Sequence, residues 1–221
     1  MASTIDDRGH TVLLLSCGVG GVFDKGRSPM GFSITWCAVR ETGAQQFLDQ
    51  LGLSPTGERE ESPESLIVMA VLDSGWRVLW YNEYGCPFLR PEDLAALSSE
   101  RDILLCLVEE HVMAGSSELW SGGARKWRIA HEGEQGPKGI DAEGELPSCF
   151  PTIRAEMEEA QRTAGGDQAD VDYLFEIPLQ VAKSLVGFKH DEDCPHLAEK
   201  PFVVLSRPAA KNGFLSRLMG S

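Results

Sequence analysis

The order of hydrophobic patterns between residues 31 and 108 constrains the fold more than any other feature of this chain. Apolar residues occupy every second position from Phe32 to Ala38, which is the period of a half-buried strand. In the segment that follows, Phe47, Leu48 and Leu51 lie on one helical face. Gly52 comes next, and glycine commonly ends a helix. The sequence therefore predicts a strand and then a helix, with a capping box at Thr42–Gln45.

The pattern continues through a hairpin, a second helix and a buried strand. The apolar segments Leu66–Leu72 and Trp76–Tyr81 flank the turn residues Asp73–Gly75 and predict a β-hairpin. Pro91 is typical of the first turn of a helix, and the unbroken apolar run Ile103–Val108 is typical of a strand buried on both faces. The order β-α-β-β-α-β predicts an α+β protein with a ferredoxin-like core, in which two helices cover one face of an antiparallel sheet.

The rest of the chain adds to this core. The segment 118–129 reads as an extra hairpin that extends the sheet, and helices are predicted to begin at Pro151 and near Pro178. Two polar segments rich in turn residues, 54–65 and 132–147, are predicted to be loops.

Four parts follow from these patterns. Residues 1–29 are predicted to be an N-terminal extension, 30–147 the α+β sheet core, 148–200 a helical C-terminal part packed on the core, and 201–221 a basic tail. A chain of 221 residues is long enough for one sizeable core.

The charge balance favours some partners over others. The chain has 20 Lys and Arg against 34 Asp and Glu, a net charge of -14. This field repels phosphate backbones, so nucleic acid is not an expected partner, whereas a basic protein would be steered toward it. Solubility alone is the other explanation of the charge. No apolar run approaches the roughly 18 residues of a membrane span.

Cysteine usage indicates a reducing compartment. The six cysteines include no Cys-x-x-Cys pair, and Cys37 and Cys106 lie within apolar runs, where a free thiol acts as a small hydrophobe. We therefore expect a cytoplasmic protein without a disulfide framework and without a cofactor. Cys86 lies in a predicted turn, but no signature of a cysteine nucleophile surrounds it.

Glu109 and His111, at the end of the buried strand, are the candidate catalytic residues. Residues two positions apart share one face of a strand, and a carboxylate beside an imidazole can perform acid-base chemistry. A solvated strand end explains the same residues.

His190, Cys194 and His196 are the candidate metal ligands, because imidazole and thiolate groups bind zinc and other transition metals. Their spacing matches neither a zinc finger nor a His-Glu-x-x-His helix, and a polar loop explains the cluster equally well. We therefore predict no metal.

Two further pairs are candidate binding residues. Trp120 and Trp127 lie in a hairpin flanked by basic residues, a composition typical of binding hot spots, although core packing is the simpler interpretation. Asp170 and Asp172 precede the last predicted helix, where they either form a face for a basic partner or interact with the helix N-terminus.

The size, acidity and α+β pattern resemble those of bacterial immunity and adaptor proteins, a likeness of composition that identifies no site. The leading hypothesis is a non-catalytic protein-interaction protein with an acidic binding face for a basic partner. The alternatives are a small hydrolase or transferase that uses Glu109 and His111 or the cluster from His190 to His196, and a small-ligand binding module.

Overall fold

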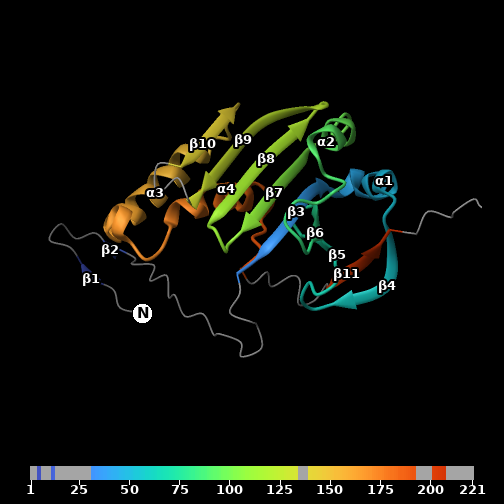
Figure 1. The fold of residues 1–221 in the computed structure, drawn as a ribbon, viewed down its shortest axis with the longest axis horizontal. Coiled ribbons are helices and arrows are strands. Elements are labelled where there is room, and N and C mark those ends of the chain that lie inside the picture. Colours follow the sequence, from blue (N-terminus) through green and yellow to red (C-terminus); the bar gives the residue numbers. More distant parts are fainter. Residues whose placement is uncertain (1–3, 6–10, 13–30, 134–138, 193–200, 208–221) are drawn as a thin grey trace, which may run out of the picture. The chain divides into compact units, whose positions relative to one another are not determined.

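The computed structural model describes residues 4–5, 11–12, 31–133, 139–192 and 201–207 (Figure 1). The chain divides into two units, Met1–Met30 and Gly31–Ser221. In the first unit, β1 (Thr4–Ile5) pairs antiparallel with β2 (Thr11–Val12). All that follows concerns the second unit.

A nine-stranded antiparallel sheet forms the centre of this unit, in the order β10-β9-β8-β7-β3-β6-β5-β11-β4. Its strands are β3 (Ser33–Arg40), β4 (Ser54–Glu60), β5 (Ile67–Val71), β6 (Trp76–Tyr81), β7 (Ile103–Glu109), β8 (Ala114–Ser121), β9 (Ala124–Glu132), β10 (Ile140–Gly144) and β11 (Phe202–Ser206).

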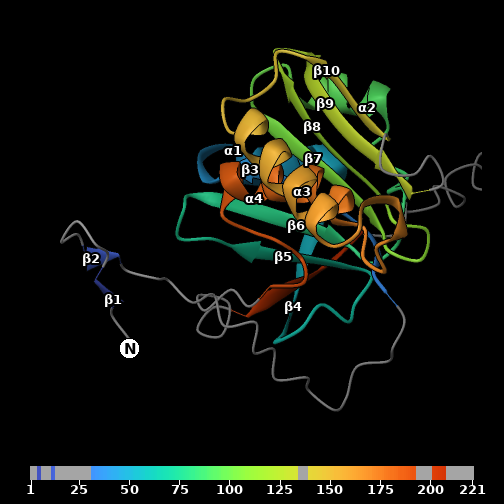
Figure 2. The same cartoon turned by 90° about the vertical axis from the view of Figure 1, so that its left-hand side faces the viewer.

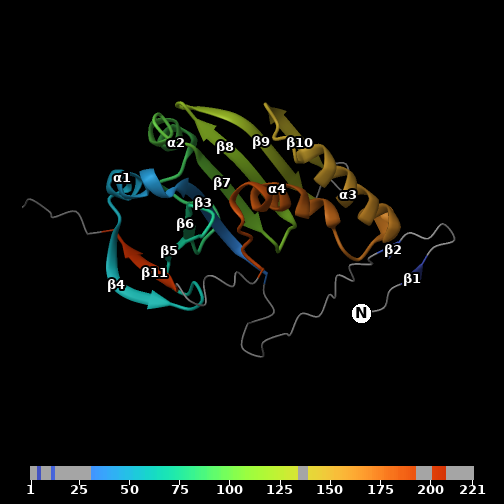
Figure 3. The same ribbon diagram turned by 180° about the vertical axis from the view of Figure 1, so that it is seen from behind.

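Helices cover both faces of the sheet, as the views in Figures 2 and 3 show. On one face, α1 (Glu41–Leu51) and α2 (Pro91–Leu97) pack over one hydrophobic cluster. On the other, α3 (Phe150–Thr163), α4 (Glu176–Val186) and the short 3₁₀ helix Tyr173–Phe175 pack over a second cluster. The described part of the chain is thus a mixed α and β structure with four α-helices and this large antiparallel sheet.

The two helical layers explain why β3 is buried along nearly its whole length. Trp36 and Ala38 face α3 and α4, whereas Cys37 and Val39 face α1 and α2. The alternation of residue types predicted a strand with one buried face. That prediction was wrong about burial, because α1, α2 and the segment 83–85 cover the face that carries Cys37 and Thr35.

The hairpin of β5 and β6 and the hairpin of β8 and β9 are confirmed. Gly52 ends α1 in the left-handed conformation, as predicted, with φ of 66°. The predicted capping box is wrong, because α1 begins at Glu41 and its N-cap, Arg40, makes no side-chain capping hydrogen bond.

Three strands lie where the sequence predicted loops or a tail. β4 and β10 fall within the predicted loops 54–65 and 132–147, and β11 falls in the predicted basic tail. β4 and β10 are the two edges of the sheet and are largely exposed, so they need no apolar pattern, and charged side chains at an edge also oppose edge-to-edge aggregation. Because β11 lies between β5 and β4, the sheet extends to Ser206. No helix in the described ranges is long and apolar enough to cross a membrane.

Candidate functional site

Strand register places three rows of side chains on the part of the α1/α2 face formed by β3, β7, β8 and β9. Each row takes one residue from each of these strands in turn. The rows are Ser33, Glu109, Ala114 and Glu132; Thr35, Leu107, Ser116 and Ala130; and Cys37, Leu105, Glu118 and Arg128. We call these rows, with the segment 84–91 that borders them, the sheet-face site.

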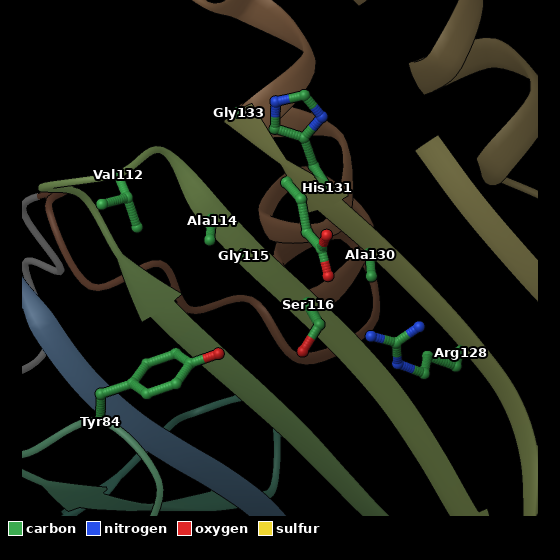
Figure 4. A pocket seen from close by; sticks show the side chains of 10 residues that line it. Tyr84, Val112, Ala114, Gly115, Ser116, Arg128, Ala130, His131 and Gly133 are labelled. Atoms are coloured by element: carbon green, nitrogen blue, oxygen red, sulfur yellow. The ribbon is translucent and has the colours of Figure 1, made fainter. Parts of the chain in front are cut away.

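One cavity of about 220 Å³ lies at the end of the sheet-face site that carries Glu132, and we call it the Tyr84 cavity. Its floor is formed by small side chains of β8 and β9, including Ala114 and Ser116. Tyr84 and Val112 at its rim are 48% and 50% exposed, which makes them two of the few large apolar residues in the described chain that face solvent. In Figure 4 the Tyr84 side chain extends from its own segment toward the strand that carries Ala114 and Ser116.

A second cavity, of about 390 Å³, lies between the segment 85–91 and the sheet, and we call it the Cys86 cavity. Its wall is mostly apolar and includes Leu89, Leu94, Leu105 and Leu107. Cys86 is buried, and burial raises the pKa of its thiol to about 12, so the thiol is neutral and unreactive at physiological pH.

The two cavities adjoin. Tyr84 lines the Tyr84 cavity, and the next residue, Gly85, lines the Cys86 cavity. Arg128 and Glu118, which are paired between β9 and β8, line the Tyr84 cavity and the Cys86 cavity respectively. The sheet-face site is therefore one surface with an apolar part and a part that carries charges.

Thr35 fixes the position of Tyr84. Its hydroxyl donates to the backbone oxygen of Glu83 at 3.1 Å and accepts from the backbone N–H of Gly85 at 2.9 Å, so it binds the chain on both sides of the tyrosine. Gly85 has φ of 77°, which favours glycine at this turn. Thr35 is buried in β3, so Tyr84 is anchored to the centre of the sheet.

The charges around Tyr84 are mainly negative. Burial raises the pKa of Tyr84, Glu109 and Glu132 raise it further, and Arg128 opposes them. Arg128 is itself paired, at 3.0 Å from Asp141 and 3.7 Å from Glu118. The Tyr84 hydroxyl is thus a neutral hydrogen-bond donor in an acidic setting.

Glu109 and His111 lie together beside the Tyr84 cavity, although His111 belongs to the turn after β7 and not to the strand itself. Oε1 of Glu109 is 2.6 Å from Nδ1 of His111, and the Ser33 hydroxyl donates to Oε2. Burial raises the pKa of Glu109, but the hydrogen bonds from Ser33 and His111 outweigh it, and the pKa lies below its usual value. The serine bonds to the carboxylate and not to the imidazole, so this arrangement does not activate a serine nucleophile.

Trp120 and Trp127 are buried in the core, with 7% and 3% exposure. They face opposite sides of the sheet, because Trp120 packs in the α1/α2 cluster and Trp127 in the α3/α4 cluster. Neither indole is available to a partner, and the hot-spot interpretation of this hairpin was wrong. Helices α2 and α4 both contact β8 and β9, so each tryptophan is covered on its own face of the sheet.

Asp170 is exposed, but Asp172 has a structural role. Asp172 caps the 3₁₀ helix by accepting from the backbone N–H groups of Leu174 and Phe175 at 3.0 and 3.3 Å. Its other oxygen lies 2.8 Å from Nε2 of His131, a buried residue of β9. Asp172 therefore joins the α3/α4 layer to the sheet.

Of the candidate metal ligands, Cys194 and His196 lie outside the described residues. His190 has a side chain only 1% exposed, and its Nε2 lies 2.9 Å from Oε1 of Glu110. Within the described ranges, no three potential ligands come together in a geometry that would hold a metal ion.

Sequence reasoning did not single out Tyr84 or Val112, and it considered Glu132 only as the start of an acidic loop that could face a basic partner. Tyr84 and Val112 lie in connecting segments, and Glu132 was assigned to the start of a loop. The pairing of β7, β8 and β9 brings Val112 and Glu132 to one surface, and the hydrogen bonds of Thr35 place Tyr84 beside them. Comparisons of the chain with protein-family profiles, curated proteins and solved structures found no match.

Proposed function

We propose that this protein is a non-catalytic interaction protein that recognises a basic protein partner through the sheet-face site, in the manner of an adaptor or immunity protein. The observation that carries the proposal is the Tyr84 cavity, where exposed Tyr84 and Val112 border a hollow flanked by Glu109 and Glu132. Exposed apolar side chains beside a cavity are typical of interaction sites. Glu109 and Glu132 outnumber Arg128 beside the cavity, which favours a cationic group, and the net charge of -14 acts in the same direction.

This proposal differs from the sequence-based hypothesis in its choice of surface. The earlier candidates Trp120, Trp127 and Asp172 are occupied within the fold. The acidic surface that remains beside a cavity is the one around Tyr84, and its carboxylates, Glu109 and Glu132, come from two separate strands, β7 and β9.

We propose three further properties. The first is a ferredoxin-like core, supported by the order β7-β3-β6-β5 of the four central strands and by α1 and α2 on one face, with β4 inserted after α1. The second is a cytoplasmic location, supported by the free, buried thiols of Cys37, Cys86 and Cys106. The third is that nucleic acid is not a partner, since the charge opposes it.

The test is affinity capture from the native host with the wild-type chain and two variants, Tyr84→Ala and Glu132→Gln. The matched control is Glu156→Gln, which removes one exposed charge from α3. We expect a basic partner that is retained by the wild type and by the control, weakens with added salt, and is lost from both site variants. A partner retained equally by all four chains would contradict the proposal.

The pair Glu109 and His111 favours a second candidate, an enzyme that uses acid-base catalysis, because the pair lies beside the cavity with its hydrogen bond formed. His111 has a side chain 47% exposed, so His111→Ala is expected to leave the fold intact. A reaction lost in this variant, with partner capture unchanged, would favour the enzyme over the interaction protein.

A further inference from the structure

The inner strand β7 has one apolar residue that the fold leaves partly uncovered. Ile103 to Cys106 and Val108 are buried, whereas Leu107, on the α1/α2 face, is only partly buried. A leucine on an inner strand is normally covered by the layer that packs on its face of the sheet. Leu107 instead lines the Cys86 cavity, so this cavity gives a ligand access to apolar surface of the core.

The segment 84–91, which forms the opposite wall of the Cys86 cavity, is held away from the sheet by its own contacts. Thr35 binds the backbone N–H of Gly85. The backbone N–H of Leu89 donates to the carbonyl oxygen of Cys86 at 3.2 Å. Two prolines of this segment also line the cavity, and their φ angles are fixed by the ring. The wall is therefore formed before any ligand arrives.

The two charged side chains that line the Cys86 cavity, Arg90 and Glu118, are paired within the fold. Arg90 lies 2.9 Å from a carboxylate oxygen of Asp93. Glu118 lies 3.7 Å from Arg128 and accepts from the indole N–H of Trp120 at 2.9 Å. The cavity thus carries one charge of each sign, both already paired, and it does not select an ion of either sign.

The rest of the lining also lacks a polar group that needs a partner. Among the buried side-chain polar atoms of the described residues, none that is without a hydrogen-bond partner belongs to this cavity. A ligand that enters exchanges water for leucine and proline surface, which favours an apolar molecule. A charged ligand would lose hydration there and gain no partner in return.

We propose that the Cys86 cavity binds an uncharged, largely hydrocarbon small molecule. Its volume of about 390 Å³ lies within the range of small-molecule sites. Because a cavity of about 150 Å³ accommodates benzene, this one has room for about 10 to 15 non-hydrogen atoms, the size of a bicyclic aromatic compound. This ligand site goes beyond the proposed function, since Tyr84 and Glu132, the residues tested for the partner, do not line the Cys86 cavity.

The test compares three probes of the same bicyclic shape: 2-naphthylmethanol, which is neutral, 2-naphthylmethylammonium and 2-naphthoate. Amide chemical shifts of the isotope-labelled full chain report both the affinity of each probe and the place where it binds. We expect the neutral probe to bind with changes at Gly85, Cys86 and Leu107. Its affinity should be at least about tenfold higher than that of either charged probe.

Two variants that fill the cavity from opposite walls locate the ligand. Leu107→Phe on the sheet and Cys86→Met in the segment 84–91 should each weaken the neutral probe about tenfold. Leu185→Phe, at an exposed leucine of α4, is the matched control and should leave the affinity unchanged. Thermal unfolding checks that each variant folds, and the neutral probe should raise the midpoint of the wild type but not that of Leu107→Phe.

No binding of the neutral probe up to its solubility limit would overturn the inference, as would equal or tighter binding of a charged probe. Unchanged affinity in both filling variants, or shift changes away from the Cys86 cavity, would also overturn it. Binding by a chain ending at Arg207 but not by the full chain would do the same, because residues 208–221 carry apolar side chains and would then be the occupant.

Discussion

Nε2 of His190 lies 2.9 Å from Oε1 of Glu110, although the two residues are 80 positions apart in the sequence. The other oxygen of Glu110 accepts from the backbone N–H of Phe32 at 2.8 Å, and the ring of Phe32 contacts the imidazole edge-on at 4.9 Å. This half-buried carboxylate thus joins the segment after α4, the end of β7 and the start of β3.

Replacing Glu110 with glutamine should lower the free energy of unfolding by about 2 kcal/mol at neutral pH, because one charged hydrogen-bond acceptor is lost. Burial raises the pKa of Glu110, but its hydrogen bonds to His190 and Phe32 outweigh it and the pKa lies below its usual value. The stabilisation is therefore complete above about pH 4.3 and is lost as the pH falls through the lower value of the folded state.

Denaturant unfolding of the wild type and of Glu110→Gln, at neutral pH and in acid, tests this. Glu58→Gln, on the exposed edge strand β4, is the control and should change little. A difference that stays constant down to low pH would show that the charge of Glu110 does not stabilise the fold.

Lys189 provides a second buried charge, with its side chain only 5% exposed and its Nζ 3.0 Å from Glu176 and 2.8 Å from Asp191. Lys189→Met should destabilise by about 3 kcal/mol, because it leaves two carboxylates without their partner. The exposed pair of Lys183 and Glu192 supplies the control, since Lys183→Met should cost less than about 1 kcal/mol.

The contribution of Lys189 to the stability of the fold depends on pH in the opposite direction to that of Glu110. Burial lowers the pKa of Lys189, but Asp191 and Glu176 outweigh it and the pKa is raised. The stabilisation is complete below about pH 10.4 and disappears as the pH rises through the higher folded-state value. Equal stability of Lys189→Met and Lys183→Met at neutral pH would contradict this assignment.

Two glycines with similar positive φ angles allow the cost of backbone strain to be measured separately from the cost of steric overlap. Gly144 in β10 has φ of 84°, and a Cβ there would lie 2.1 Å from the backbone oxygen of Lys126. Gly57 in β4 has φ of 95°, with no atom within 4 Å of such a Cβ. Gly57→Ala should cost about 1 kcal/mol, and Gly144→Ala about 2 kcal/mol more, in denaturant unfolding. Equal costs would mean that β10 adjusts freely.

The ionisation of Tyr84 reports on the acidity of the sheet-face site. Because Glu132 contributes to its raised pKa and Arg128 opposes it, Glu132→Gln should lower the pKa of Tyr84 and Arg128→Gln should raise it. NMR titration of the tyrosine ring signals measures both shifts, with Tyr81 as an internal reference away from these two residues. Shifts of the same sign in both variants would contradict the arrangement around Tyr84.

Thr35→Val tests how Tyr84 is held. The variant keeps a side chain of similar shape but removes the hydroxyl that binds Glu83 and Gly85, and it should cost about 1–2 kcal/mol. The amide of Gly85 should also exchange with solvent much faster, while amides of the β5–β6 hairpin stay protected. Unchanged exchange at Gly85 would show that Tyr84 is held by other contacts.

The elements that could be predicted from the sequence are those with strong local signals. The hairpin turn before Trp76 and the glycine at the end of α1 were found because turns and helix ends depend on nearby residues. The edge strands β4 and β10 were missed because exposed edges carry no hydrophobic period. β11 does carry an apolar run, Phe202–Leu205, that favours a strand, but it was missed because the segment was grouped with the basic residues that follow it.

In the candidate site, too, local contacts could be predicted from the sequence and long-range contacts could not. Glu109 and His111 were expected to share a strand face, but β7 ends at Glu109, and the turn that follows brings the His111 imidazole to the carboxylate. The contribution of Glu132 depends on the register of β8 against β9, which no local pattern encodes. Trp120 and Trp127 were misread as candidate binding residues because composition alone does not distinguish an exposed hairpin from one inside a larger sheet.

The proposed site is tested most directly by mapping, with amide chemical shifts, where the basic partner captured from the host contacts the isotope-labelled protein. We expect changes concentrated in the segment 83–91 and in the facing parts of β8 and β9, around Ala114–Glu118 and Arg128–Glu132. Changes confined to α3 or to the edge strand β4, with none around Tyr84, would contradict it.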